Sequence, residues 1–213
     1  MHVRPIEFDA AIVRWSPQDA TGFTGADDAL RSWLRERSVG TGSLSVIHEH
    51  QATVTGSAGV LASLSAGGRS EVMKRGISLG SRDGCVVLAF PKLERLSELS
   101  RGLSTGGTVV VFEYGAPPAL DGWMAATGAY NLSTGETTPP LDDELHDTFV
   151  AMLMWEREIG GGAQRGKQRE LVQRPLATLK SAGLDEDFVI TYCAALGLSD
   201  NYLTKLRAHY KQA

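Results

Sequence analysis

Two short runs of apolar residues constrain the fold of this chain more than any other feature. They cover residues 85–90 and 108–112, and a glycine-containing turn precedes each of them. Neither run alternates polar and apolar residues, as a strand with one solvated face would. Strands that are apolar on both faces occur in parallel sheets that carry helices on each side. The two runs therefore predict the centre of such a sheet.

The surrounding segments predict the other elements of that sheet and its helices. Residues 91–103 place leucines on one helical stripe, and Asp27 and Asp28 open a second amphipathic helix that carries Trp33 on its apolar face. Further elements are expected as strands at 44–47 and 129–133, helices at 53–66 and from 117 onward, and either a strand or a helical turn at 10–15. Together these patterns predict a Rossmann-like, three-layer α/β domain with a mainly parallel sheet over residues 1–138.

The last third of the chain has a different pattern. The tract 133–140 ends in two prolines and has the composition of a linker. Beyond it we find no strand-like period, so residues 139–213 predict an all-helical subdomain. Its helices are expected at 142–159, 164–181, 186–196 and 200–211, with Pro175 splitting or restarting the second of them. Apolar side chains surround the helix at 149–155, which predicts that it packs on the first domain or on a second copy, as in a homodimer.

Composition excludes several classes of protein. The chain has 213 residues, of which 42% are hydrophobic and 22% charged, as is typical of globular proteins. Its net charge of −4 argues against a surface built as a whole to hold nucleic acid. The longest apolar stretch, 149–155, is far shorter than the roughly 20 residues of a membrane span. Cys85 and Cys193 show no metal or redox spacing. Taken together, these features lead us to expect a soluble, cytoplasmic protein without a resident metal or cofactor.

Polar residues at the ends of the predicted strands are the candidates for catalysis. They are His48, His50, Lys92 and Glu113. Ligands of open parallel sheets bind beyond the carboxyl ends of the strands, so these side chains could form an acid–base site. His48 and His50 could also supply two ligands to a transition metal. Because no third ligand stands at a telling spacing, a surface or core-edge position is the favoured interpretation of this pair.

Three other segments allow a ligand-binding interpretation that their context does not favour. Residues 56–59 and 160–169 are glycine-rich, but neither contains a nucleotide-binding fingerprint, and the second follows a helix instead of a strand. The acidic residues of 142–147, with His146 among them, could resemble a metal cluster. Negative charge at the start of a helix is, however, what the helix dipole favours.

The end of the chain has the most regular pattern. Residues 189–208 resemble the helix-turn-helix template of DNA-binding proteins, with small Cys193 in the first helix and Gly197 at the turn. A recognition helix would expose Asn201, Lys205 and Arg207, which are side chains that can contact bases or phosphates. The resemblance covers about twenty residues, and the favoured interpretation is a structural helical hairpin.

Two functional hypotheses follow. The first is a non-catalytic binding or regulatory protein, in which the α/β domain contacts a small ligand or a protein partner and the helical end makes protein contacts, with DNA contacts less favoured. The second is an enzyme with a polar acid–base site at the strand ends. The first is preferred because no set of residues has the spacing that a particular reaction demands.

Overall fold

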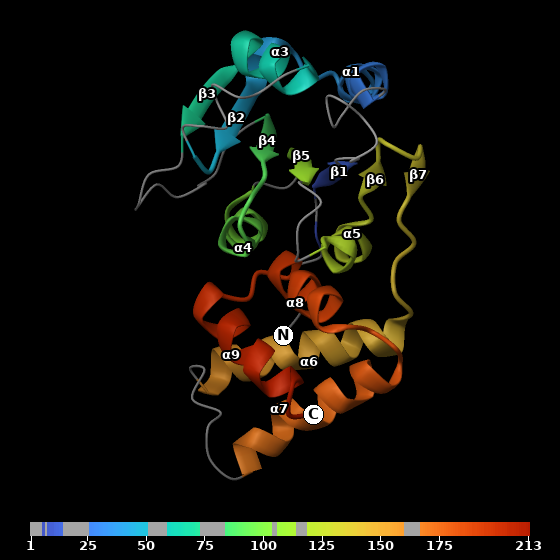
Figure 1. Cartoon of the computed structure of the whole chain (residues 1–213), viewed down its shortest axis with the longest axis vertical. Coiled ribbons are helices and arrows are strands. Elements are labelled where there is room, and N and C mark those ends of the chain that lie inside the picture. Colours follow the sequence, from blue (N-terminus) through green and yellow to red (C-terminus); the bar gives the residue numbers. More distant parts are fainter. Residues whose placement is uncertain are drawn as a thin grey trace.

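Among the residues that the computed structural model describes, seven strands form one sheet (Figure 1). The described residues are 6, 8–14, 26–50, 59–72, 84–103, 106–113, 119–159 and 167–213. The strand order is β3-β2-β4-β5-β1-β6-β7. All neighbours run parallel except β6 and β7, which are antiparallel. The predicted class, an α/β fold with a mainly parallel sheet and a helical C-terminal part, is confirmed.

The elements lie close to the predicted positions. The strands are β1 (Asp9–Arg14), β2 (Leu44–His48), β3 (Arg69–Val72), β4 (Cys85–Ala89), β5 (Thr108–Glu113), β6 (Tyr130–Asn131) and β7 (Glu136–Thr137). The helices are α1 (Ala26–Glu36), the 3-10 helix η1 (Thr41–Ser43), α3 (Gly59–Gly67), α4 (Leu93–Gly102), α5 (Asp121–Thr127), α6 (Asp143–Ile159), α7 (Lys167–Ser181), α8 (Glu186–Ala195) and α9 (Asp200–Tyr210). The segment at 10–15, left open between strand and turn, is strand β1 in the interior of the sheet.

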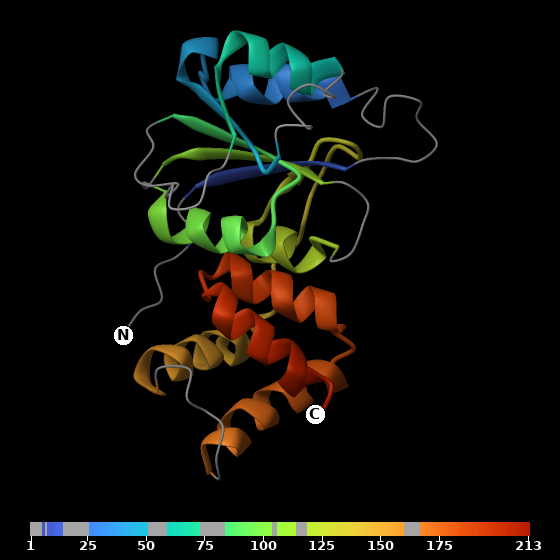
Figure 2. The ribbon, with the colours of Figure 1, turned by 60° about the vertical axis from the view of Figure 1, so that its left-hand side comes forward.

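The sheet is buried on both faces, as the apolar runs predict. Strands β4 and β5 are buried along their whole length, and alternate residues enter two separate cores. Val87 and Val110 face α1 and α3, whereas Leu88 and Val111 face α4 and α5. Figure 2 shows these helix pairs as layers above and below the sheet. The three-layer arrangement follows from side chains that are apolar on both faces of each central strand.

The helical end packs on the α4–α5 layer and shares its core. Helix α8 is buried from Val189 to Ala195 and lies directly against α5. Gly122 of α5 makes this close approach possible, because a Cβ atom there would lie 1.9 Å from the carbonyl oxygen of Phe188. Helices α6 and α7 lie farthest from α1 and α3 (Figure 1). The ring of Phe149 in α6 stacks on that of Tyr192 in α8, with their centroids 4.1 Å apart.

The structure corrects two expectations about the helices. Helix α7 continues through Pro175 instead of splitting there. A proline inside a helix costs about 3 kcal/mol, but burying Leu176 and Leu179 on the same face stabilises the helix by a comparable amount. The helix around 149–155 is not buried all round, because Met154 is 37% exposed.

The tract 133–140 also differs from a plain linker. Its residues Glu136 and Thr137 form β7, which pairs with β6 across a turn that Gly135 closes with a positive φ of 77°. Both β7 residues are exposed, so this edge strand carries no apolar signal in the sequence. Within the described residues, no helix is long and apolar enough to cross a membrane.

Candidate functional site

The sheet has a topological switch point between β1 and β5. The chain leaves β1 toward β2 on one side of the sheet and leaves β5 toward β6 on the other. In open α/β sheets, ligands bind in the crevice outside such a pair of strand ends. Arg14 and Glu113 are the last residues of the two strands and are register partners, so their side chains leave the sheet on the same face. These two residues therefore mark the first candidate site.

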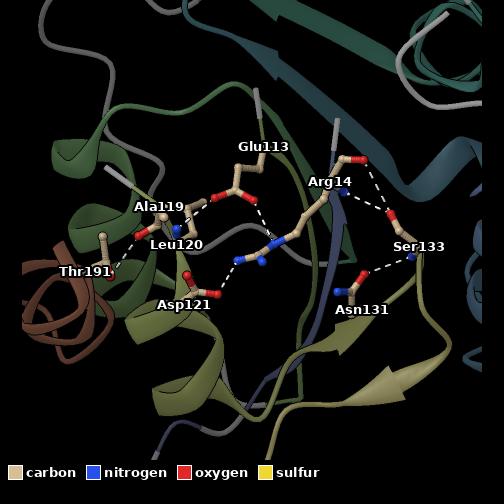
Figure 3. Close-up of polar contacts among 8 residues, drawn as sticks. All are labelled: Arg14, Glu113, Ala119, Leu120, Asp121, Asn131, Ser133 and Thr191. Atoms are coloured by element: carbon tan, nitrogen blue, oxygen red, sulfur yellow. Dashed lines mark hydrogen bonds and ion pairs between the residues drawn. The ribbon is translucent and has the colours of Figure 1, made fainter. Parts of the chain in front are cut away.

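The charged groups at this switch point are bound to one another (Figure 3). Arg14 Nε lies 2.9 Å from Glu113 Oε2, and Arg14 Nη2 lies 2.6 Å from Asp121 Oδ1. The backbone N–H of Leu120 donates to Glu113 Oε1 at 2.8 Å. Glu113 is 8% exposed, so it is a nearly buried carboxylate held by an arginine and by an amide at the start of α5. An acid already bound in this way is poorly placed to exchange protons with a substrate.

The same arginine fixes the edge of the sheet. The backbone N–H of Arg14 donates to Ser133 Oγ at 3.2 Å, and the N–H of Ser133 donates to Asn131 Oδ1 at 2.9 Å. These bonds connect the end of β1 to the β6–β7 hairpin (Figure 3). Arg14 thus joins β1, β5, α5 and the hairpin, and we interpret its role as structural. Nothing in the local sequence singles it out, because Glu113 and Asp121 are about one hundred residues away.

The structure does not bring His48 to Glu113. His48 continues the face of β2 on which Val46 packs toward α1 and α3, whereas Glu113 lies on the α4–α5 face of β5. The His48 ring is fully buried, and its Nε2 lies 3.2 Å from Ser65 Oγ in α3. Burial lowers the pKa of His48, because an imidazolium loses its hydration there. The sheet itself therefore separates these two candidates.

The remaining strand-end candidates, His50 and Lys92, follow β2 and β4. His50 and Lys92 are both exposed. The backbone N–H of Lys92 donates to Glu49 Oε1 at 3.4 Å, and Arg95 Nε lies 3.3 Å from the same oxygen. Glu49 therefore connects the end of β2 to the start of α4. Within the described ranges, no group of three or more His, Cys, Asp or Glu residues could hold a metal ion. The glycine-rich residues 56–58 and 160–166 lie outside the described part of the chain.

The three candidates for DNA contact do not share one face of α9. Asn201 is exposed, and Lys205 is half-buried one turn further along. Arg207 projects about 160° around the helix from Lys205 at 100° per residue. Its guanidinium lies 3.7 Å from Asp187 and 4.0 Å from Glu186, both in the first turn of α8. This pairing directs Arg207 toward its own hairpin.

The second candidate site is a groove between α6 and α7, which we call the α6–α7 groove. It has a volume of about 1020 Å³. The described residues that line it are Asp143, Glu144, Asp147, Thr148 and Ala151 of α6, and Glu170, Leu171, Arg174, Pro175 and Thr178 of α7. Among these described residues, Ala151, Leu171 and Pro175 are apolar, four carry carboxylates and one carries a guanidinium. The acidic start of α6 is visible in the sequence, but helix-dipole effects account for it equally well, so only the pairing with α7 reveals the groove.

The uncharged polar groups of the groove act mainly as hydrogen-bond acceptors. The hydroxyl of Thr148 donates to the carbonyl of Glu144 at 2.9 Å, and that of Thr178 donates to the carbonyl of Arg174 at 3.2 Å. Their oxygens keep lone pairs to accept further bonds. Pro175 has no N–H, so the carbonyl of Leu171 lacks the donor that a helix normally supplies four residues later. The groove therefore offers many acceptors and, in Arg174, a strong donor.

Comparison with known proteins adds no relative: no family model matches this chain, and neither a curated protein nor a solved structure matches it significantly.

Proposed function

We propose that this chain is a non-catalytic binding protein whose helical end contacts a protein partner in the α6–α7 groove. The observation that carries the proposal is the groove itself, which has a volume of about 1020 Å³ and is lined by both apolar and charged residues. Cavities that bind ligands are concave and combine apolar walls with a few polar groups that fix orientation. Helix α6 packs on α7 and α8, and α7 packs on α9, so the surface is formed by helices that already contact one another, which lowers the cost of ordering it on binding.

The arrangement at the strand ends supports a binding role over a catalytic one. Glu113 is held by Arg14 and by a backbone amide, and His48 faces the other side of the sheet. The sequence that follows β1, residues 15–25, contains no lysine or arginine that could bind a phosphate. These features favour an α/β domain that serves as a scaffold.

The proposal is tested by site-specific crosslinking in the native cell. A photoreactive amino acid replaces Ala151 in the groove or, as a matched control, the exposed Ala208 on α9. We expect a discrete protein adduct from position 151 and none of the same mass from position 208. The protein in that adduct is then purified and its Kd for the full chain is measured.

The purified partner separates a true site from chance proximity. Ala151→Trp fills the groove with a large side chain and should raise the Kd at least tenfold, whereas Ala208→Trp should leave it unchanged. Absence of an adduct at position 151, identical adducts from both positions, or a Kd that Ala151→Trp does not alter would each contradict the proposed function.

A further inference from the structure

We propose that the occupant of the α6–α7 groove is a basic amphipathic helix of the partner protein, an inference that rests on the proposed function and specifies its partner. The first argument is charge. Asp143, Glu144 and Asp147 line the α6 side, and Glu170 and Arg174 line the α7 side. Among the lining residues that the structure describes, four are acidic and one is basic, and all three charged residues on the α6 side are acidic. A partner segment rich in Lys or Arg is complementary to this surface.

Hydrogen bonding leads to the same chemistry. The hydroxyls of Thr148 and Thr178 already donate to carbonyls of their own helices, so toward the groove they offer lone pairs. The carbonyl of Leu171 is released from its helical bond by Pro175. Carboxylates are acceptors without exception when ionised. A partner must therefore bring donors, and ammonium and guanidinium groups are the side chains that donate several bonds without accepting any.

The shape of the lining favours a helix as the form of that partner. Each wall contributes residues at positions i, i+1, i+4, i+5 and i+8, which is one continuous helical face. Each face is about 12 Å long at 1.5 Å per residue, or a little over two turns. A third helix laid between two such walls would place apolar anchors at i, i+3, i+4 and i+7 against Ala151, Leu171 and Pro175. Its flanking basic residues would then reach the carboxylates on the α6 rim.

Two synthetic peptides test the inference by fluorescence anisotropy with the full chain. The basic probe is a helix of about 15 residues, or four turns, with leucines at i, i+3, i+4 and i+7 and Lys or Arg on its flanks. The acidic probe keeps the leucines and replaces every Lys or Arg by Glu. We expect the basic probe to bind and the acidic probe to bind at least tenfold more weakly. Raising the salt concentration should weaken the binding of the basic probe, because salt screens the attraction between exposed charges.

Matched substitutions locate the bound probe. Asp147→Lys reverses the charge of one rim residue. We expect it to weaken binding of the basic probe about fivefold, which corresponds to the free energy of one exposed charge pair. Asp200→Lys makes the same change of net charge at an exposed residue of α9, outside the groove, and should leave the affinity unchanged. Ala151→Trp should abolish binding, and Ala208→Trp should not. The urea unfolding curve of each variant shows that it is folded.

Failure of this inference is distinguishable from failure of the proposed function. Equal binding of both probes, lost in Ala151→Trp, would overturn the basic-helix inference and leave the groove as a partner site. A basic probe that fails to bind, or that binds Ala151→Trp and Asp147→Lys as well as the parent, would also overturn the inference. The proposed function is contradicted separately, by the crosslinking outcome at position 151.

Discussion

Gly122 is the residue whose replacement tests the packing of the helical end most sharply. A Cβ atom at this position would lie 1.9 Å from the Phe188 carbonyl oxygen, 2.7 Å from Thr191 Oγ1 and 2.7 Å from the Tyr192 amide nitrogen. Two of these three atoms belong to the α8 backbone, so no rotamer change can remove the clash. Helices α5 and α8 would have to separate by roughly 1.5 Å to restore ordinary contact. Because α8 is the main contact between the helical end and the α/β domain, the strain falls on the shared core.

The expected loss for Gly122→Ala is about 2–3 kcal/mol of the free energy of unfolding, the upper part of the range for overpacked cores. Urea unfolding of the full chain, followed by tryptophan fluorescence, measures it as a lower midpoint at similar slope. Gly42→Ala in η1 is the matched control, because no atom lies within 4 Å of its added methyl group. That control should shift stability by less than about 1 kcal/mol. If Gly122→Ala were as stable as the parent, the close approach of α5 and α8 would be refuted.

Three further predictions concern buried polar groups. Burial lowers the pKa of His48, so below about pH 6.5 the unfolded chain takes up a proton that the folded chain does not. The free energy of unfolding should therefore decrease as the pH is lowered below about 6.5, by at most about 1.4 kcal/mol per pH unit. Urea unfolding from pH 7.5 to 5 measures this slope, which should flatten in His48→Gln; an unchanged slope would contradict the assignment. Arg14→Met removes the cation beside nearly buried Glu113 and should lower the free energy of unfolding by about 1–2 kcal/mol. Glu113→Gln should cost less, because the glutamine can still accept a hydrogen bond from the Leu120 amide. If urea unfolding gave the reverse order, this network would be contradicted. Burial raises the pKa of Cys85 to about 12, so its thiol should stay unreactive toward a chromogenic disulfide at pH 8 until urea unfolds the chain, and rapid native labelling would contradict its burial.

The central strands and most helices could be predicted because their side chains carry the signal locally. Strands β4 and β5 are apolar on both faces, and the leucines of α4 repeat at helical spacing. Strand β3 is partly exposed at one edge of the sheet, and β7 is exposed at the other, so neither has an apolar pattern to find. The sequence predicts a turn at Gly197 between the last two helices, and the φ of Gly197 is 88° there. This turn requires a positive φ, which glycine adopts without strain, so the glycine marks the turn in the sequence.

The candidate sites were harder to predict because they depend on pairing between distant segments. The sequence predicts that His48 and Glu113 lie at the carboxyl ends of strands, but the alternation of side chains puts them on opposite faces of the sheet. Arg14 has no local pattern and becomes important through its register with Glu113. The α6–α7 groove depends on how the two helices pack against each other and on their contacts with α8 and α9, and neither helix carries that information alone.

Amide hydrogen exchange tests most directly whether the partner binds in the α6–α7 groove. Exchange is measured on the full chain alone and in its non-covalent complex with the partner protein that crosslinking at position 151 identifies. We predict that protection gained in the complex concentrates in residues 143–151 and 170–178, the two walls of the α6–α7 groove. Protection gained instead around Arg14 and Glu113, with α6 and α7 unchanged, would contradict the claim and locate the binding site at the strand ends.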